Sequence, residues 1–406
     1  MKRVFCPLIL VVPLLLLGCT QRGFETKGGW SGPVIMEDNV YVGSQKGRLW
    51  ALNKLAGTNI WNRSFPSQEQ DPLGGVLYGA PAADNDRVYF ATWSSEDEEV
   101  GLVYAVGISD GLPAWKEPFL VDGHVVGGPV LVGREKCVTA DRGSVDGDVL
   151  LFGSTGGSVY ALCAVDGSLS WKIETEGEVW ASPVVEEGTV YVGSQDKAFY
   201  AISLDTGAQR WKPFKSGGAI IGKAAISDGK VFFGALDGKF YALNARSGTP
   251  VWREPFDGGT WFWAGAVTDD ERVYAVDTAG MVYGLGMDTG FAQWQAELGE
   301  MVVSTPLLAG QEGNERLVVA TKSGRISVRQ ADRGAEEWVL ELTGPDGNPV
   351  KVKAALGGEA GLVVVSTMDP WTVQALDLDS KKINWCVYLD DENSTLIKSQ
   401  GECSGM

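Results

Sequence analysis

The sequence predicts an all-β protein, an eight-bladed β-propeller whose blades are four-stranded antiparallel sheets. Tryptophan recurs eight times at intervals of 40 to 56 residues, and glycines and aromatic residues keep fixed distances from it. Each repeat also divides into four short runs rich in Val, Tyr, Phe and Ile, separated by Asp and Gly. Segments with helical periodicity are scarce. A fixed internal period favours one large domain built from small units over two or three separate domains.

Tryptophan anchors the repeat. Gly stands four residues before it in seven repeats, and Lys381 is the exception. An aromatic residue stands eleven residues before it in six repeats, and Gly stands fourteen before it in six. Because one indole occurs in every repeat, we expect these residues to cover the gaps between blades rather than to stack on a ligand. The eight positions are Trp61, Trp115, Trp171, Trp211, Trp252, Trp294, Trp338 and Trp385.

The repeat that ends near Trp211 illustrates the predicted strands, at 181–185, 189–194, 198–203 and 208–214. The short connections between these strands require neighbouring strands to run antiparallel. A four-stranded sheet has two apolar faces, and closing such sheets into a ring buries the faces of every blade. The predicted blades span residues 31–66, 76–120, 125–175, 179–215, 219–257, 262–299, 302–343 and 350–390.

The N-terminus reads as a targeting segment. Lys2 and Arg3 precede an apolar run at 4–17, which is too short to span a bilayer comfortably but suits a signal peptide. The sequence Leu-Leu-Gly-Cys at 16–19 resembles a bacterial lipobox, which implies cleavage before Cys19 and a lipid on its thiol. A plain secretory signal or an uncleaved anchor is the alternative.

The expected organisation therefore has four parts. Residues 1–18 form the signal peptide, 19–30 a lipidated linker, 31–390 the propeller and 391–406 a polar C-terminal tail.

The net charge argues against nucleic acid as a partner. The formal net charge is −18, and so acidic a surface repels nucleic acid phosphates.

Four cysteines allow three disulfide pairings, and they are Cys137, Cys163, Cys386 and Cys403. Proximity in sequence favours Cys137–Cys163 and Cys386–Cys403, although the sequence leaves the pairing open.

The stretch GGTWFWAGA at 258–266 is the strongest candidate for a ligand platform. In a strand, Trp261 and Trp263 share one face, and Trp180 holds the equivalent place in its own repeat. We place these residues at the beginning of the innermost strand, near the central opening. They form either an aromatic platform for a quinone, sugar or peptide, or wedges between blades, which is the favoured interpretation.

Acidic stretches offer weaker candidates. Residues 94–101 form a connection that could bind a cation or a basic partner, but a solvated loop is favoured. Asp141, Asp146 and Asp148 supply oxygen donors without the EF-hand spacing.

His124 is the single histidine, and we expect it in a turn or between blades rather than in catalysis. The sequence thus indicates no catalytic residue, no metal site and no cofactor site.

The segments GKFYALNARSGTPVW (238–252) and GSVYALCAVDGSLSW (157–171) resemble the PQQ-like repeat, with its core Gly-x-x-Tyr-Ala-Leu-x-x-x-x-Gly-x-x-x-Trp. The resemblance covers essentially residues 31–390. One branch of this repeat family, the quinoprotein dehydrogenases, binds PQQ and Ca²⁺ at the ring centre, is usually much longer and typically carries adjacent cysteines, which this sequence lacks. The other branch is the lipoprotein scaffold subunit of the outer-membrane β-barrel assembly machinery.

In length, lipobox and blade number the sequence looks like the second branch. The resemblance implies an exported propeller, anchored through Cys19, that faces the periplasm or the cell exterior. It implies a non-catalytic scaffold that binds envelope proteins, possesses no cofactor and takes part in outer-membrane protein assembly. A PQQ-binding or other small-ligand or sugar-binding propeller, related to quinoprotein dehydrogenases, is the alternative, and the sequence does not name the partner.

Overall fold

The computed structural model describes residues 31–44, 47–61, 76–93, 100–139, 143–310, 313–344, 347–359, 361–369 and 371–389, and the backbone of 397–398. The predicted signal peptide, Cys19 and the linker lie outside the described residues, as does most of the predicted tail. The described residues form strands and turns but no helix, so they include no helix long and apolar enough to cross a membrane.

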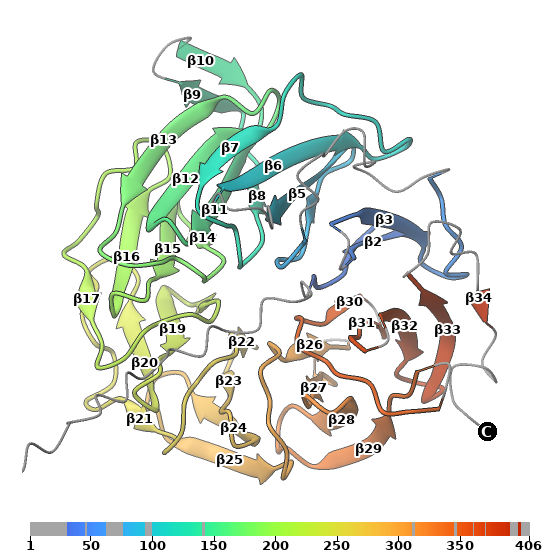
Figure 1. Cartoon of the computed structure of the whole chain (residues 1–406). Coiled ribbons are helices and arrows are strands. Elements are labelled where there is room, and N and C mark those ends of the chain that lie inside the picture. Colours follow the sequence, from blue (N-terminus) through green and yellow to red (C-terminus); the bar gives the residue numbers. More distant parts are fainter. Residues whose placement is uncertain are drawn as a thin grey trace, which may run out of the picture.

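The chain folds into the predicted eight-bladed propeller of antiparallel sheets (Figure 1). Blade 1 contains β1 (Val34–Met36), β2 (Asn39–Gly43) and β3 (Leu49–Asn53). Blade 2 contains β4 (Ala82–Ala83), β5 (Arg87–Trp93), β6 (Val100–Gly107) and β7 (Phe119–Asp122). Blade 3 contains β8 (Val130–Val132), β11 (Val149–Ser154), β12 (Ser158–Cys163) and β13 (Leu169–Glu174). Blade 4 contains β14 (Val184–Glu186), β15 (Thr189–Gly193), β16 (Ala198–Ser203) and β17 (Phe214–Lys215).

The second half of the ring repeats this plan. Blade 5 contains β18 (Ala225–Ser227), β19 (Lys230–Gly234), β20 (Lys239–Asn244) and β21 (Phe256–Asp257). Blade 6 contains β22 (Val267–Thr268), β23 (Arg272–Val276), β24 (Met281–Gly286) and β25 (Ala292–Glu297). Blade 7 contains β26 (Leu307–Ala309), β27 (Arg316–Ala320), β28 (Arg325–Gln330) and β29 (Glu336–Glu341). Blade 8 contains β30 (Gly357–Glu359), β31 (Leu362–Ser366), β32 (Thr372–Asp377), β33 (Lys382–Tyr388) and β34 (Ile397–Lys398).

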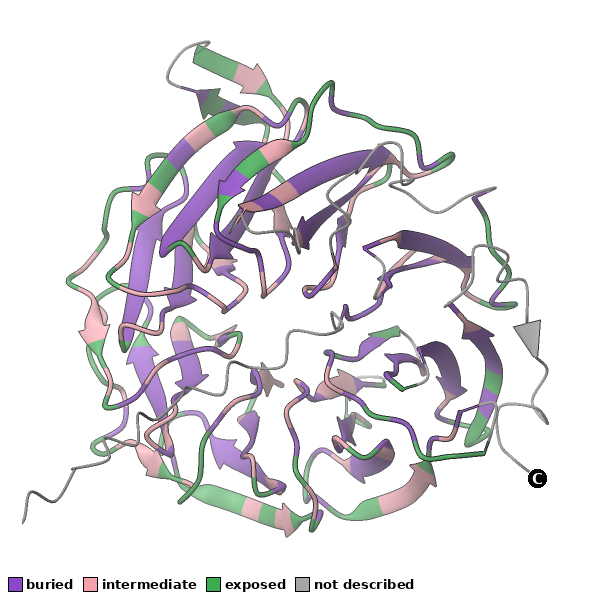
Figure 2. Cartoon of the chain, viewed as in Figure 1, coloured by how far each residue is buried: buried purple, intermediate pink, exposed green. Residues whose placement is uncertain are grey.

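Within each blade the chain runs from the centre of the ring to its edge. The first strands of neighbouring blades contact each other, for example β14 with β18 and β18 with β22. The second and third strands are buried because both faces of the sheet pack against other blades (Figure 2). All six residues of β12 are buried, whereas the outermost strand β13 has one buried and three exposed residues. The core is therefore a series of layers between blades.

Tight turns join the first two strands of a blade. Glu186 pairs with Thr189 across a two-residue turn, in which Glu187 and Gly188 both have positive φ, 45° and 70°. Two positive φ values are typical of the type I′ turn, whose twist matches that of antiparallel strands.

The length of the fourth strand depends on whether a proline precedes it. In blade 4 the sequence predicts a strand over 208–214, but β17 covers only Phe214–Lys215, and Gln209 makes an isolated bridge. Pro213 has no N–H to donate to the sheet, so the strand resumes only after it. Pro118 and Pro255 precede β7 and β21 in the same way. Blades 3, 6, 7 and 8, which lack this proline, carry a continuous fourth strand, such as β25.

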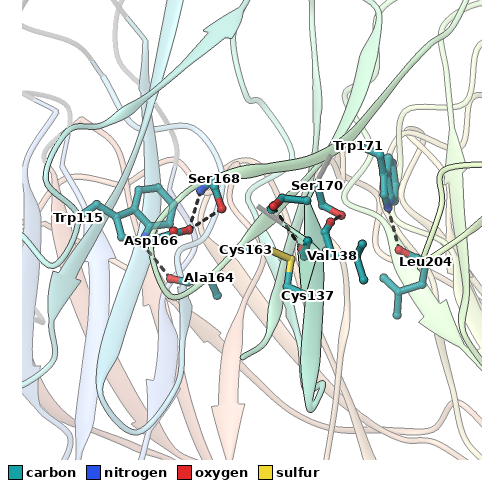
Figure 3. The surroundings of a disulfide bond; sticks show 12 residues. Trp115, Cys137, Val138, Cys163, Ala164, Asp166, Ser168, Ser170, Trp171 and Leu204 are labelled. Carbon is teal, nitrogen blue, oxygen red and sulfur yellow. Dashed lines mark hydrogen bonds between the residues drawn. A yellow bond between two sulfur atoms is a disulfide. The ribbon is translucent and has the colours of Figure 1, made fainter. Parts of the chain in front are cut away.

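Blade 3 carries an insertion that the sequence analysis does not anticipate. After β8 the chain forms a hairpin of β9 (Lys136–Thr139) and β10 (Gly143–Asp146), which projects from the outer edge of the ring (Figure 1). Cys137 of β9 forms a disulfide with Cys163 of β12, the pairing that sequence proximity favours. Ser170 of β13 also donates a hydrogen bond to the Val138 carbonyl (Figure 3). The hairpin is thus fixed to the blade covalently.

Blade 8 closes the ring against blade 1. Strand β30 contacts β1, and the Ser366 hydroxyl donates a hydrogen bond to the Ser31 carbonyl at 2.6 Å. Cys386 is disulfide-bonded. Cys403, its favoured partner by sequence, lies outside the described residues.

Candidate functional site

Tryptophan side chains close seven of the eight seams between blades in the same way. Trp171 Nε1 donates a hydrogen bond to the Leu204 carbonyl of the next blade at 2.7 Å (Figure 3). Gly207 of that blade lies against the indole, where a Cβ would come within 3.1 Å of the ring. The repeated glycine is therefore required by the tryptophan of the preceding blade. The other six pairs are Trp61 with Ile108, Trp115 with Ala164, Trp211 with Ala245, Trp252 with Met287, Trp294 with Ala331 and Trp385 with Lys54.

The seam between blades 7 and 8 is different. Trp338 Nε1 is buried and has no hydrogen-bond partner among the described residues. The residue at the glycine position of blade 8 is Lys381, whose φ is 60°. This left-handed conformation costs a residue with a side chain about 1 kcal/mol or more.

A three-residue approach segment leads into the first strand of blades 2 to 8. Its middle residue is buried, with at most 4% of the side chain exposed, as in Val179 and Phe262. The third residue lines a central cavity, and these residues are Tyr78, Val126, Trp180, Ile221, Trp263, Val303 and Lys353. Side chains alternate in this way along an extended backbone.

The first residue of each approach segment is called here a rim residue. Its carbonyl accepts a hydrogen bond from the end of the second strand or the turn that follows it, in the same blade. Thr278 N–H donates to the Trp261 carbonyl at 2.9 Å, and Lys322 N–H donates to that of Met301 at 2.7 Å. The rim residues therefore mark the face of the ring that carries these turns. They are Val76, His124, Glu178, Ala219, Trp261, Met301 and Lys351.

The cavity on the ring axis has a volume of about 440 Å³. Its wall consists mostly of Gly, Ala, Pro, Val and Leu, with Trp180, Trp263 and Tyr78 as its aromatic residues. Among the described residues that line it, Lys223 and Lys353 are the only charged ones. The cavity is thus apolar with two ammonium groups.

The structure brings together two of the three tryptophans predicted as a platform. Trp180 and Trp263 meet edge to face, with ring centroids 6.2 Å apart and planes at 74°. Trp180 Nε1 donates to Glu178 Oε2 at 2.6 Å, which fixes its indole. Trp261 does not line the cavity but is a rim residue, 56% exposed.

The prediction that this segment starts the first strand is wrong. Strand β22 begins only at Val267, and the Trp261 carbonyl accepts a hydrogen bond from Thr278 N–H in the turn after β23.

His124 is a buried rim residue between blades 2 and 3. Its ring lies 4.3 Å from that of Trp93, and its Nδ1 has no hydrogen-bond partner among the described residues. Burial lowers the pKa of His124 to about 4, so it is neutral near pH 7. This placement agrees with the predicted role between blades.

The acidic stretches provide no assembled site in the described part of the chain. Residues 94–99 and Asp141 lie outside the described residues. Asp146 belongs to β10, and Asp148 Oδ1 accepts a hydrogen bond from Arg134 N–H at 2.8 Å. No group of three or more His, Cys, Asp and Glu side chains among the described residues is placed to hold a metal ion.

Comparison with known proteins identifies the family. A family model described as "Outer membrane protein assembly factor BamB" matches residues 20–118 and 99–258, which together exceed half of the chain. The chain belongs to this family. The resemblance to BamB-like propellers of PQQ-like repeats is therefore confirmed.

Individual relatives match over part of their length. BamB of Moranella endobia is 26% identical over 196 residues, which cover 44% of this chain and 43% of that protein. A quinoprotein ethanol dehydrogenase of Pseudomonas putida is 35% identical over 100 residues, which cover 23% of this chain and 15% of the enzyme. The chain thus spans less than half the length of these curated relatives.

Solved structures share the fold of this BamB-family chain. BamB of Moraxella catarrhalis superposes with a TM-score of 0.66 at 14% identity, covering 85% of this chain and 95% of that one. The computationally designed protein Ika8 also gives 0.66, at 17% identity, covering 86% and 96%.

Sequence reasoning missed Met301, Lys353 and Lys223. Met301 and Lys353 occupy the rim and cavity positions of the approach segment, so aligning these segments on their buried middle residue would have found them. Lys223 lies two residues beyond the approach segment of blade 5, and only the folded ring shows that it lines the cavity.

Proposed function

We propose that this BamB-family chain is an exported, lipid-anchored scaffold that docks a protein partner during outer-membrane protein assembly. One structural observation carries the proposal. Trp261 and Met301 are 56% and 48% exposed at the same rim position of blades 6 and 7. Aromatic residues and methionine are enriched in the centres of protein interfaces, where they bury large apolar areas.

The proposed scaffold has no catalytic activity. Relatives described as assembly factors support it, whereas the matched quinoprotein ethanol dehydrogenase aligns over only 15% of its own length. The purified protein supplied with PQQ, Ca²⁺ and ethanol is expected to reduce no electron-acceptor dye. Sustained dye reduction would establish the dehydrogenase alternative instead.

Site-specific photocrosslinking tests the docking surface. A benzoylphenylalanine at position 261 is expected to crosslink an outer-membrane assembly protein in intact cells. The matched control is position 291, because Phe291 is 78% exposed in the same blade but precedes the outer strand β25. Equal crosslinking from both positions, or none from position 261, would contradict docking at the rim.

The anchor is tested separately. Cys19→Ser removes the thiol that carries the lipid in this proposal, so the protein is expected to move from the membrane fraction to the soluble fraction. Two acyl chains hold a protein on a membrane stably, at about 0.8 kcal/mol for each buried methylene. Unchanged sedimentation with membranes would count against lipidation at Cys19.

A further inference from the structure

The charge of the central cavity is opposite to that of the whole chain. The chain has 52 acidic and 34 basic residues, yet the lining of the cavity includes two lysines and, within the described part of the chain, no Asp or Glu. Because the low-dielectric walls of a cleft focus the field of the charges within it, ammonium groups in this cavity favour an anionic ligand.

Lys223 occupies a fixed position in this cavity. Its carbonyl accepts a hydrogen bond from Ala266 N–H of blade 6 at 3.1 Å, which ties its backbone to the next blade. Its side chain is exposed to the cavity, and partial desolvation by the protein around it lowers the pKa of its ammonium group. It forms no ion pair with any described residue. A carboxylate placed beside it would form a charge-assisted hydrogen bond that no described residue provides.

The wall beside the lysines is apolar and aromatic. Trp180 and Trp263 present their edge-to-face pair to the cavity, and Glu178 holds the Trp180 indole in place. Such a wall binds an apolar group by burying its surface, and the volume of about 440 Å³ admits a small molecule or one end of a peptide.

We propose that the central cavity binds a ligand that carries a carboxylate on an apolar body, with the carboxylate at Lys223 and Lys353 and the apolar body against Trp180 and Trp263. Two kinds of ligand carry a carboxylate on an apolar body, namely a free organic acid and the C-terminal residue of a peptide. The site is separate from the exposed rim pair, so it stands independently of the docking proposal.

Calorimetric titration of the purified full-length protein tests the site with matched probes. The probes are 3-phenylpropionate and its uncharged amide, 3-phenylpropanamide, which differ in the carboxylate alone. The acid is expected to bind about tenfold or more tightly than the amide, since hydrogen bonds to charged groups contribute about 1.5 kcal/mol or more. Equal affinity for the two probes, or no binding of either, would overturn the proposal.

Variants assign the roles of the residues. Lys223→Gln is expected to abolish the preference for the acid, while Lys223→Arg retains it. Trp263→Ala weakens binding of both probes. Lys382→Gln, on the exposed face of β33, is the control and leaves both affinities unchanged. An unchanged preference in Lys223→Gln and in Lys353→Gln, with both variants folded by thermal unfolding, would also refute the proposal.

A second pair of probes separates the two sources. An N-acetylated tetrapeptide that ends in leucine is compared with the same peptide amidated at its C-terminus. Tighter binding of the free-carboxylate peptide than of 3-phenylpropionate supports a chain terminus as the ligand. The reverse order supports a free organic acid.

Discussion

At the scale of the residue, tryptophans at equivalent positions of different blades contribute differently to stability, because one has a hydrogen-bond acceptor and another has none. Trp252 is 4% exposed and donates to the Met287 carbonyl at 2.7 Å, whereas Trp338 Nε1 is buried without an acceptor among the described residues. A buried polar group without a partner costs free energy that a hydrogen bond would recover.

Substitution of these two tryptophans by phenylalanine measures this difference. Trp252→Phe leaves the Met287 carbonyl unpaired and is expected to cost about 1–3 kcal/mol more free energy of unfolding than Trp338→Phe, which removes an N–H that is already unpaired. Chemical denaturation of both variants provides the comparison. A loss at Trp338 as large as that at Trp252 would contradict the seam geometry.

His124 is expected to make stability depend on pH. Its folded pKa of about 4 lies below the usual 6.5, so the unfolded chain binds a proton first as the pH falls. The folded state therefore has its full stability above pH 6.5 and loses up to about 3 kcal/mol between pH 6.5 and 4. His124→Phe keeps an aromatic ring against Trp93 but cannot titrate.

Denaturation at a series of pH values separates this effect from the protonation of carboxylates, which is common to both proteins. The stability of the wild type should fall relative to His124→Phe across this range. Parallel curves would show that His124 titrates normally in the folded protein.

At the scale of the element, local chemistry decides where the outer edge of each blade departs from the repeat. A proline precedes and shortens the fourth strand in blades 2, 4 and 5, and a disulfide fixes the inserted hairpin β9–β10 to β12 in blade 3. The prolines are visible in the sequence, so the short fourth strands could have been predicted from it. The hairpin could not, because its short strands carry little apolar periodicity and its position depends on a covalent bond to a distant strand.

Removal of the Cys137–Cys163 disulfide is expected to lower the free energy of unfolding by about 3 kcal/mol, because the bond closes a loop with a sequence separation of 26. The double variant Cys137→Ala with Cys163→Ala tests this by chemical denaturation under oxidising conditions. Both cysteines are buried, so a comparison of the wild type and the double variant under reducing conditions, where neither has the bond, controls for the lost side-chain packing. No change in the denaturation midpoint of the double variant would argue that the bond does not constrain the unfolded chain.

At the scale of the whole molecule, the ring closes through contacts between the two ends of the propeller. Trp385 Nε1 donates to the Lys54 carbonyl at 2.8 Å across 331 residues of sequence, and Lys54 pairs with Glu359 at 3.1 Å. The exposed ion pair contributes little, whereas the indole belongs to a buried apolar cluster that joins blades 1 and 8.

A closed ring predicts equal effects at the closing seam and at an internal seam. Trp385→Ala and Trp115→Ala are each expected to cost about 3–5 kcal/mol, the usual range for a buried tryptophan. Thermal and chemical unfolding measure both. If Trp385→Ala had almost no effect, blade 8 would be separating from blade 1 in solution, and the ring would be open.

The sequence by itself determined the fold and the seams, because Trp and Gly recur at fixed offsets and each blade repeats the same local physics of strand, turn and apolar face. It also indicated Trp180 and Trp263 as neighbours of the central opening. Only the tertiary structure decided which side chains meet there. The cavity joins residues from all eight blades, so Lys223, Lys353 and the tryptophan pair are distant in sequence and are brought together only after the ring has closed. The folded ring also places Trp261, which is two residues from Trp263, on the exposed rim.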